Sequence, residues 1–278
     1  MKKTFPILVI ALLAGCGWKA DGLERLESRY GTDATESEPT CPAASDATPE
    51  ASAAPAMSGT WAVRLVQHSL LLGSMPLHIS DLFVGKVAAD GTGIDLTFCT
   101  EDSVGSDFSS KFGQTTMSDE AVHGLNKSSP VRIPLAAGAL PKATRVAWQW
   151  GVNLAKPFDD ALPTDKTDPR IFDQDGDGRP GLTVTVAEPA GDRYMAKRVV
   201  WDLADGAGVG GDWVFGGLAF RIDQQVYGAT SSILETVAPI ESDPAAPSAW
   251  QMHKEADDLD CPKLLAKWKE LFGCAPTP

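Results

Sequence analysis

The chain has 278 residues, a formal net charge of −13 at pH 7 and a hydrophobic content of 43%. Such an acidic balance repels phosphate backbones and anionic lipid headgroups, which argues against a nucleic-acid partner and against a basic membrane-binding surface. It favours the binding of cations instead. The apolar content includes eight tryptophans. It is enough to build the core of one domain of about 200 residues.

The N-terminus has the three parts of an export signal. Lys2 and Lys3 form a basic start, residues 5–14 form an apolar run, and small residues precede Cys16. The run of about ten residues is too short to span a bilayer as a helix. Residues 13–16, Leu-Ala-Gly-Cys, resemble the lipobox of bacterial lipoprotein precursors. We therefore expect residues 1–15 to be a lipoprotein signal peptide.

The lipobox resemblance implies that cleavage occurs before Cys16 and that acyl chains such as palmitate are attached to this cysteine. Two or three chains anchor a protein stably, because each buried methylene contributes about 0.8 kcal/mol. Gly17 follows the cysteine. In many such proteins an Asp at this position directs retention in the inner membrane, so the resemblance favours the outer membrane or the cell surface. The alternative is a soluble secreted protein with a cysteine in its signal region.

Four further cysteines are expected to form two disulfides in an exported chain. They are Cys41, Cys99, Cys261 and Cys274. Residues 262–272 predict an amphipathic helix with a proline at its start and Gly273 at its end. The ends of a ten-residue helix lie about 15 Å apart, whereas a disulfide needs Cα atoms within about 7 Å, so Cys261 and Cys274 are not expected to pair. We favour Cys99 with Cys261 and Cys41 with Cys274, and free buried thiols are the alternative.

The composition divides the exported chain into a tether and a folded domain. Residues 31–57 are rich in Ala, Ser, Thr, Pro, Asp and Glu. Such a segment buries too little apolar surface to offset the entropy lost on ordering. We therefore expect residues 16–57 to be a lipidated, disordered tether and residues 58–278 to be the folded domain.

Alternating apolar residues and turn residues dominate the folded domain and predict about nine short strands. In the first, Trp61, Val63 and Leu65 share one face, and Arg64 and His68 share the other. The expected strands span 60–68, 78–87, 93–99, 145–154, 182–187, 194–203, 213–223, 225–234 and 250–253. We expect a mainly β fold, a single antiparallel β-barrel or sandwich with a short C-terminal helix, because a sheet of this size must hide its edges.

A long polar segment, residues 101–129, separates the early strands from the later ones and has no evident regular structure. Connections of this length are usually functional or mobile. One alternative function, a hydrolase, would use this segment as a lid.

The chemically most informative segment is FDQDGDGRPGLTVTV, residues 172–186. Asp173, Asp175 and Asp177 stand at alternate positions and Gly178 follows, which is the opening pattern of calcium-binding loops. Three carboxylates within five residues repel one another unless a hard divalent cation neutralises them. We predict a calcium site in residues 173–184, with the carbonyl of Arg179 as the next ligand. An exposed acidic turn without an ion is the alternative.

The loop departs from the EF-hand pattern, because Val184 stands where a bidentate Glu is needed. The segment leads into a predicted strand, so its remaining ligands must come from elsewhere. Asp168, Asp165 and Thr183 are the nearest candidates, and Asp168 is the one we favour. A strand held by its neighbours favours a stabilising ion over a switching one.

Two resemblances concern this loop. It is similar to the calcium loops of FG-GAP-type propeller proteins, which carry several copies and have Asp where this chain has Gly181. Three features in order also resemble a family of uncharacterised bacterial surface lipoproteins: Gly-Thr-Trp-Ala at 59–62, the D-x-D-G-D-G-x-P-G-x-T-V loop, and the late Cys261. This resemblance implies a β architecture with a bound calcium ion. It does not point to any reaction, because the family has no assigned activity.

The other motifs carry less information about function. Gly206, Gly208 and Gly211 match a dinucleotide-binding pattern, but an aromatic, strand-like stretch follows instead of a helix, which predicts a hairpin loop. The four histidines have no metal-ligand spacing, and G-x-S-x-G and P-loop motifs are absent. We therefore expect no enzymatic activity.

The expected function is that of a lipid-anchored, calcium-binding envelope protein with a structural or binding role. Its partners would be the membrane and an envelope protein, a polysaccharide or a small apolar ligand. The alternative is a carrier of a small apolar ligand, because Gly59-x-Trp61 resembles the opening strand of lipocalins. Tryptophans that could line such a pocket, or equally form a core, are Trp148, Trp150, Trp201, Trp213 and Trp250.

Overall fold

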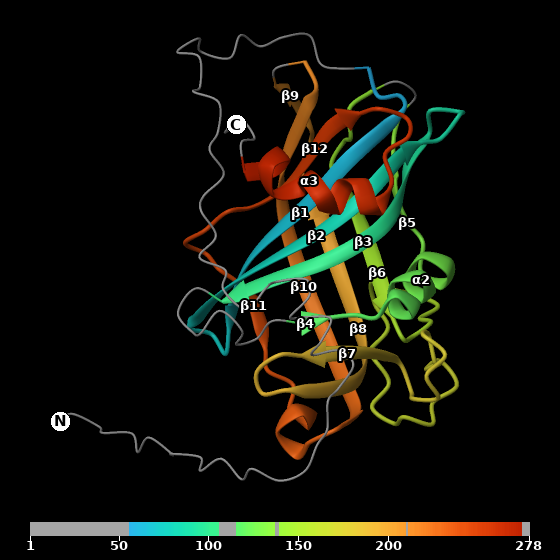
Figure 1. Ribbon diagram of the computed structural model, residues 1–278, viewed down its shortest axis with the longest axis vertical. Coiled ribbons are helices and arrows are strands. Elements are labelled where there is room, and N and C mark those ends of the chain that lie inside the picture. Colours follow the sequence, from blue (N-terminus) through green and yellow to red (C-terminus); the bar gives the residue numbers. More distant parts are fainter. Residues whose placement is uncertain (1–55, 106–114, 137–138, 210, 274–278) are drawn as a thin grey trace, which may run out of the picture.

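The computed structural model describes residues 56–105, 115–136, 139–209 and 211–273 (Figure 1). The predicted signal peptide, Cys16, Cys41, Cys274 and nearly all of the predicted tether lie outside these residues. Among the described residues, no helix is long and apolar enough to cross a membrane.

The fold is mainly β, as predicted, and in the described residues it consists of one antiparallel sheet of twelve strands. The strands are β1 Thr60–Leu71, β2 Met75–Val87, β3 Gly93–Gly105, β4 Thr115–Thr116, β5 Val131–Pro134, β6 Thr144–Trp150, β7 Leu182–Val186, β8 Gly191–Leu203, β9 Ala207–Val209, β10 Trp213–Ala229, β11 Ile240–Ser242 and β12 Ser248–Glu255. The described helices are α2 Asp119–Ser128, the 3-10 helix η1 Ser232–Glu235 and α3 Cys261–Gly273.

The sheet curls into a half-barrel. Its main path runs β4-β7-β8-β10-β12-β1-β2-β3-β5, and β6, β9 and β11 pair with β8, β10 and β1. β5 and β6 also lie in contact. One wall, formed by β1, β2 and β3, therefore faces a second wall formed by β6, β8 and β10 (Figure 1). Side chains from both walls meet on the concave face.

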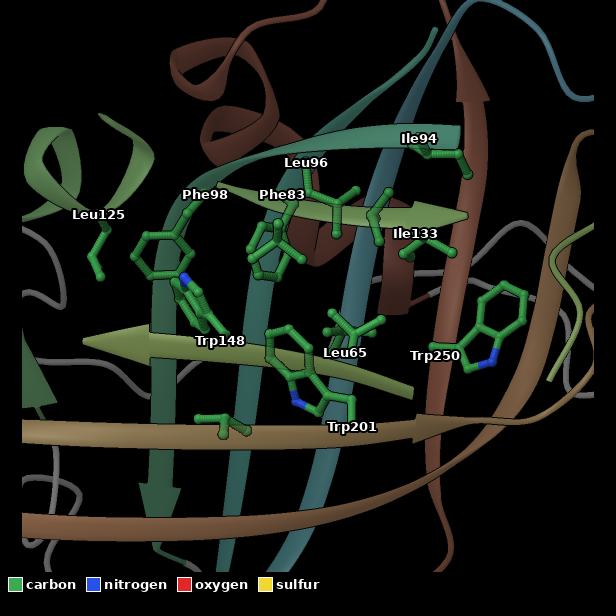
Figure 2. Close-up of a cluster of buried hydrophobic side chains, with 14 of the residues drawn as sticks. Leu65, Phe83, Ile94, Leu96, Phe98, Leu125, Ile133, Trp148, Trp201 and Trp250 are labelled. Atoms are coloured by element: carbon green, nitrogen blue, oxygen red, sulfur yellow. The ribbon is translucent and has the colours of Figure 1, made fainter. Parts of the chain in front are cut away.

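The concave face holds the main hydrophobic core. Phe83 and Phe98 from the first wall pack against Trp148 and Trp201 from the second wall, with ring centroids 4.8–6.1 Å apart (Figure 2). Each of these side chains is at most 2% exposed. Aromatic pairs at such distances stabilise a core beyond the area that they bury.

The tryptophans that were expected to line a pocket or form a core are mostly core residues. Trp148, Trp150, Trp201 and Trp250 are at most 2% exposed and belong to the concave-face core. Trp213 lies on the convex face, where it contacts Phe272 of α3. The indole rings therefore fill this part of the concave face by packing against one another and the phenylalanines.

The convex face is covered by α3, which lies across β1, β2 and β3 (Figure 1). Leu264 and Phe272 of the helix are buried against Leu82, Val84 and Cys99 of the sheet. Cys99 and Cys261 form a disulfide with a Cα–Cα distance of 5.2 Å. This is the pairing favoured from the sequence, while the pairing of Cys41 with Cys274 lies outside the described residues.

Two expectations about regular structure were wrong. Residues 101–129 are not one irregular connection, because Glu101 continues β3 to Gly105 and residues 119–128 form α2. The segments 213–223 and 225–234 are not two strands either. They form the single strand β10, which has an irregular register near Val226 and is followed by η1.

Candidate metal site

The predicted calcium loop is a closed turn at the start of β7. The backbone of Gln174 donates to the carbonyl of Gly181 at 2.9 Å, and Gly181 donates to Phe172 at 3.2 Å, so the two ends of the loop are clipped together. Gly176 and Gly178 have φ angles of +77° and +82°. Such angles are readily adopted by glycine, so Gly178 permits the sharp turn expected of it.

The turn brings together the three predicted carboxylates. Ligand atoms from Asp173, Asp175 and Asp177 lie within 4.8 Å of one another. Calcium binds oxygens at about 2.3–2.6 Å, so two oxygens on opposite sides of the ion lie about 4.6–5.2 Å apart. The cluster can therefore hold a metal ion.

Backbone donors hold these carboxylates in place. Asp173 accepts hydrogen bonds from the N–H groups of Gly176 and Gly178 at 2.7 and 2.8 Å. Asp175 accepts from the N–H of Thr183 at 3.0 Å, and Asp177 accepts from the hydroxyl of Thr183. These hydrogen bonds order the loop, and Thr183 joins it to β7.

The environment of Asp175 favours a cation. This side chain is about half buried, and its Oδ1 atom is buried without a hydrogen bond from any described residue. Burial, with the neighbouring charge of Asp177 as a smaller cause, raises the pKa of Asp175 to about 6. A bound divalent cation would satisfy the orphaned oxygen and relieve the repulsion between the carboxylates.

Two residues that sequence spacing did not single out fix the loop against the rest of the domain. The side chain of Gln174 is 8% exposed, accepts from the N–H of Gly151 and donates to the hydroxyls of Ser128 and Ser129. Gly124 of α2 lies against the same residue, because a Cβ there would stand 2.1 Å from the carbonyl oxygen of Gln174.

A pocket of about 410 Å³ opens beside the loop. Asp175 and Asp177 line it, together with Glu120 from α2 and Asp192 from β8. These two further acidic residues stand far from the loop in sequence, so only the fold reveals that they lie near it.

The other predicted ligands are placed as follows. Asp168 is not in the acidic cluster. Both of its oxygens accept from Arg170, which holds the pKa of Asp168 down at about 2. Asp165 accepts from Thr167 instead. The N–H of Arg179 donates to Asp177, while ligation by its carbonyl stays a prediction.

The glycine motif at 206–211 leads into a hairpin, as predicted, because β9 pairs with the start of β10. Among the described residues, no histidine belongs to a group that could hold a metal ion. His68 and His78 contact each other by their rings, and His253 contacts Glu255.

Comparison with known proteins finds no matching family model, no similar curated protein and no similar solved structure.

Proposed function

We propose that this chain is a lipid-anchored protein of the bacterial cell envelope in which a calcium ion stabilises the β domain. The observation that carries the calcium proposal is the grouping of Asp173, Asp175 and Asp177 around the orphaned oxygen of Asp175. The ion would neutralise three carboxylates and tie the turn to β7. The role is structural or in binding, because the loop is held by a sheet strand rather than by two helices that can open.

Direct titration of calcium into the full chain tests the site. By calorimetry we expect a dissociation constant of about 10⁻⁴–10⁻³ M, the range of extracellular calcium modules. Asp175→Asn removes a charged ligand and should weaken binding by about tenfold or more.

Asp159→Asn is the matched control for this titration, because Asp159 is an exposed carboxylate outside the cluster. It should bind calcium like the wild type. Absence of binding in the wild type, or equal binding in Asp175→Asn, would remove the site from the proposal.

The anchor is supported by the lipobox-like sequence that ends at Cys16. Replacing this cysteine with Ser prevents acylation, so the protein should move from the membrane fraction to the soluble fraction of fractionated cells. Cys41→Ser serves as the control, since it removes a cysteine outside the lipobox, and this variant should stay with membranes. Retention of Cys16→Ser in the membrane fraction would refute the anchor.

A further inference from the structure

The inward side chains of β1 change from apolar to polar along the strand. Trp61, Val63 and Leu65 belong to the concave-face core, and Gln67 and Ser69 follow on the same face, each 1% exposed. Buried polar groups are costly unless they are hydrogen-bonded, so this half of the concave face requires partners.

A continuous line of polar contacts crosses the concave face here. Gln67 donates to Asp81 at 2.6 Å, and Asp81 stands directly opposite Glu101 in the pairing of β2 with β3. Glu101 accepts from the ammonium group of Lys197 at 2.5 Å, and this group lies 3.9 Å from the ring centre of Trp150.

The ion pair between Glu101 and Lys197 joins opposite walls rather than neighbouring strands. Glu101 is on β3 and Lys197 is on β8, and the path between them along the sheet passes through β10, β12, β1 and β2. Both side chains are at most 8% exposed. The pair therefore connects distant parts of the sheet directly across its concave face.

The charges of this cluster balance only when one carboxyl group carries a proton. Asp81 and Glu101 are two acids, and Lys197 is one base. Complete burial raises the pKa of Asp81 well above its usual value near 3.8, and the charge of Glu101 raises it further, against a smaller opposing effect of Lys197. Protonated Asp81 can donate to Glu101, which leaves Glu101 and Lys197 as a balanced ion pair.

The strongest charge effects on Asp81 come from inside the cluster. They are those of Glu101 from β3 and Lys197 from β8. The remaining elements around the cluster contribute uncharged groups, namely Gln67 from β1, Thr115 from β4 and Trp150 from β6. Arg193, the next basic residue on this face of β8, is half buried, and its charge is not among the largest effects on the pKa of Asp81.

We propose that Asp81, Glu101 and Lys197 form a proton-sensitive strut that holds the two walls of the half-barrel together and lets them separate when Asp81 ionises. Ionisation leaves two buried carboxylates for one ammonium group, and buried charge without a partner is strongly destabilising. Water that enters between the separated walls would be able to hydrogen-bond to Oε1 of Gln67 and Oγ of Ser69, because both atoms are buried without a described partner.

The direction of the pH effect follows from this assignment. Asp81 is protonated in the folded state at pH values where it is ionised in the unfolded chain. Its contribution to stability is therefore fully present below about pH 4 and is lost as the pH rises through its raised folded-state pKa.

Thermal melts of the full chain across pH test the strut. Asp81→Asn keeps the shape of the side chain and cannot ionise. Between about pH 4 and the raised folded-state pKa of Asp81, the melting temperature of the wild type should fall relative to that of Asp81→Asn by about 3–5 °C per pH unit. Quenching of tryptophan fluorescence by acrylamide should rise with pH in the wild type and not in the variant, because Trp150 contacts the strut.

The control is Asp202→Asn, which removes a carboxylate that is half exposed and pairs with Arg145. It should keep the pH dependence of the wild type. If Asp81→Asn fails to fold, Glu101→Gln leaves one carboxyl group for Lys197 and should likewise abolish the loss of stability at high pH. Wild-type melting curves that run parallel to those of Asp81→Asn or Glu101→Gln over this range would overturn the strut.

Discussion

At the scale of single residues, Gly124 shows how closely α2 is fitted to the acidic loop. A methyl group at this position would press on the carbonyl oxygen of Gln174 at 2.1 Å. Two effects of Gly124→Ala therefore oppose each other. Alanine stabilises a helix interior by about 1 kcal/mol relative to glycine, whereas overpacking costs about 1–3 kcal/mol.

We expect the clash to dominate, so Gly124→Ala should lower the free energy of unfolding by about 1–2 kcal/mol in urea denaturation. His123→Ala is the control, because His123 is exposed on the same helix. It gains helix propensity without a clash and should be neutral or slightly stabilising. Equal effects of the two substitutions would show that α2 does not press on the loop.

The roles of the loop residues differ in how well they can be predicted from the sequence. Asp173, Asp175 and Asp177 are evident because a local spacing determines that they meet in one turn. Gln174 is hidden between them, since its role depends on Gly151 and on the serines at the end of α2. Asp81 and Glu101 were not predicted as partners at all, because their pairing requires the register of two long strands.

At the scale of elements, the strands with strict alternation were the easiest to predict. β1 is an example, with Trp61, Val63 and Leu65 all in the concave-face core. β10 was wrongly divided at Gln224, because no alternation is evident where both faces are only partly buried. The short strands β4, β5, β9 and β11 have too few residues to produce a pattern and become strands through their partners.

Helix α2 was missed although its local features are present in the sequence. Ser118 caps the helix by accepting a hydrogen bond from the N–H of Ala121. Asp119 and Glu120 lie in the first turn, where their negative charges interact favourably with the positive end of the helix dipole. Only about one turn of apolar spacing, Ala121 to Leu125, supports these features. The polar residues around them obscured the pattern.

The disulfide shows that a predicted helix can exclude one pairing of cysteines. A predicted helix between Cys261 and Cys274 excluded their pairing, and the structure joins Cys261 to Cys99. The bond connects α3 to β3 over a sequence separation of 162 residues. Long loops of this kind are those for which a cross-link restricts the unfolded chain most.

At the scale of the whole molecule, the domain is a half-barrel whose concave face has an aromatic half and a polar half. The prediction of a barrel or sandwich was confirmed as a class. The curvature that brings β3 opposite β8 was not predictable, because it depends on contacts between residues about a hundred positions apart. The same curvature produces the buried contact between Glu101 and Lys197.

The acidic loop connects to the rest of the half-barrel through α2, β6 and β7. An ion bound in the loop should therefore stabilise the entire domain rather than one turn. At about 10 mM calcium and the affinity expected above, binding contributes about 1.4–2.7 kcal/mol. For a domain of about 200 residues this corresponds to a rise of about 3–10 °C in melting temperature.

The most direct test of the account is the melting temperature of the full chain in 10 mM calcium (about ten to a hundred times the expected dissociation constant) compared with EDTA. We expect the melt to shift upward with calcium in the wild type and in Asp159→Asn, and to shift clearly less in Asp175→Asn, because its site binds calcium about tenfold more weakly or worse. Identical melting curves of the wild type with calcium and with EDTA would contradict a stabilising ion at Asp173, Asp175 and Asp177.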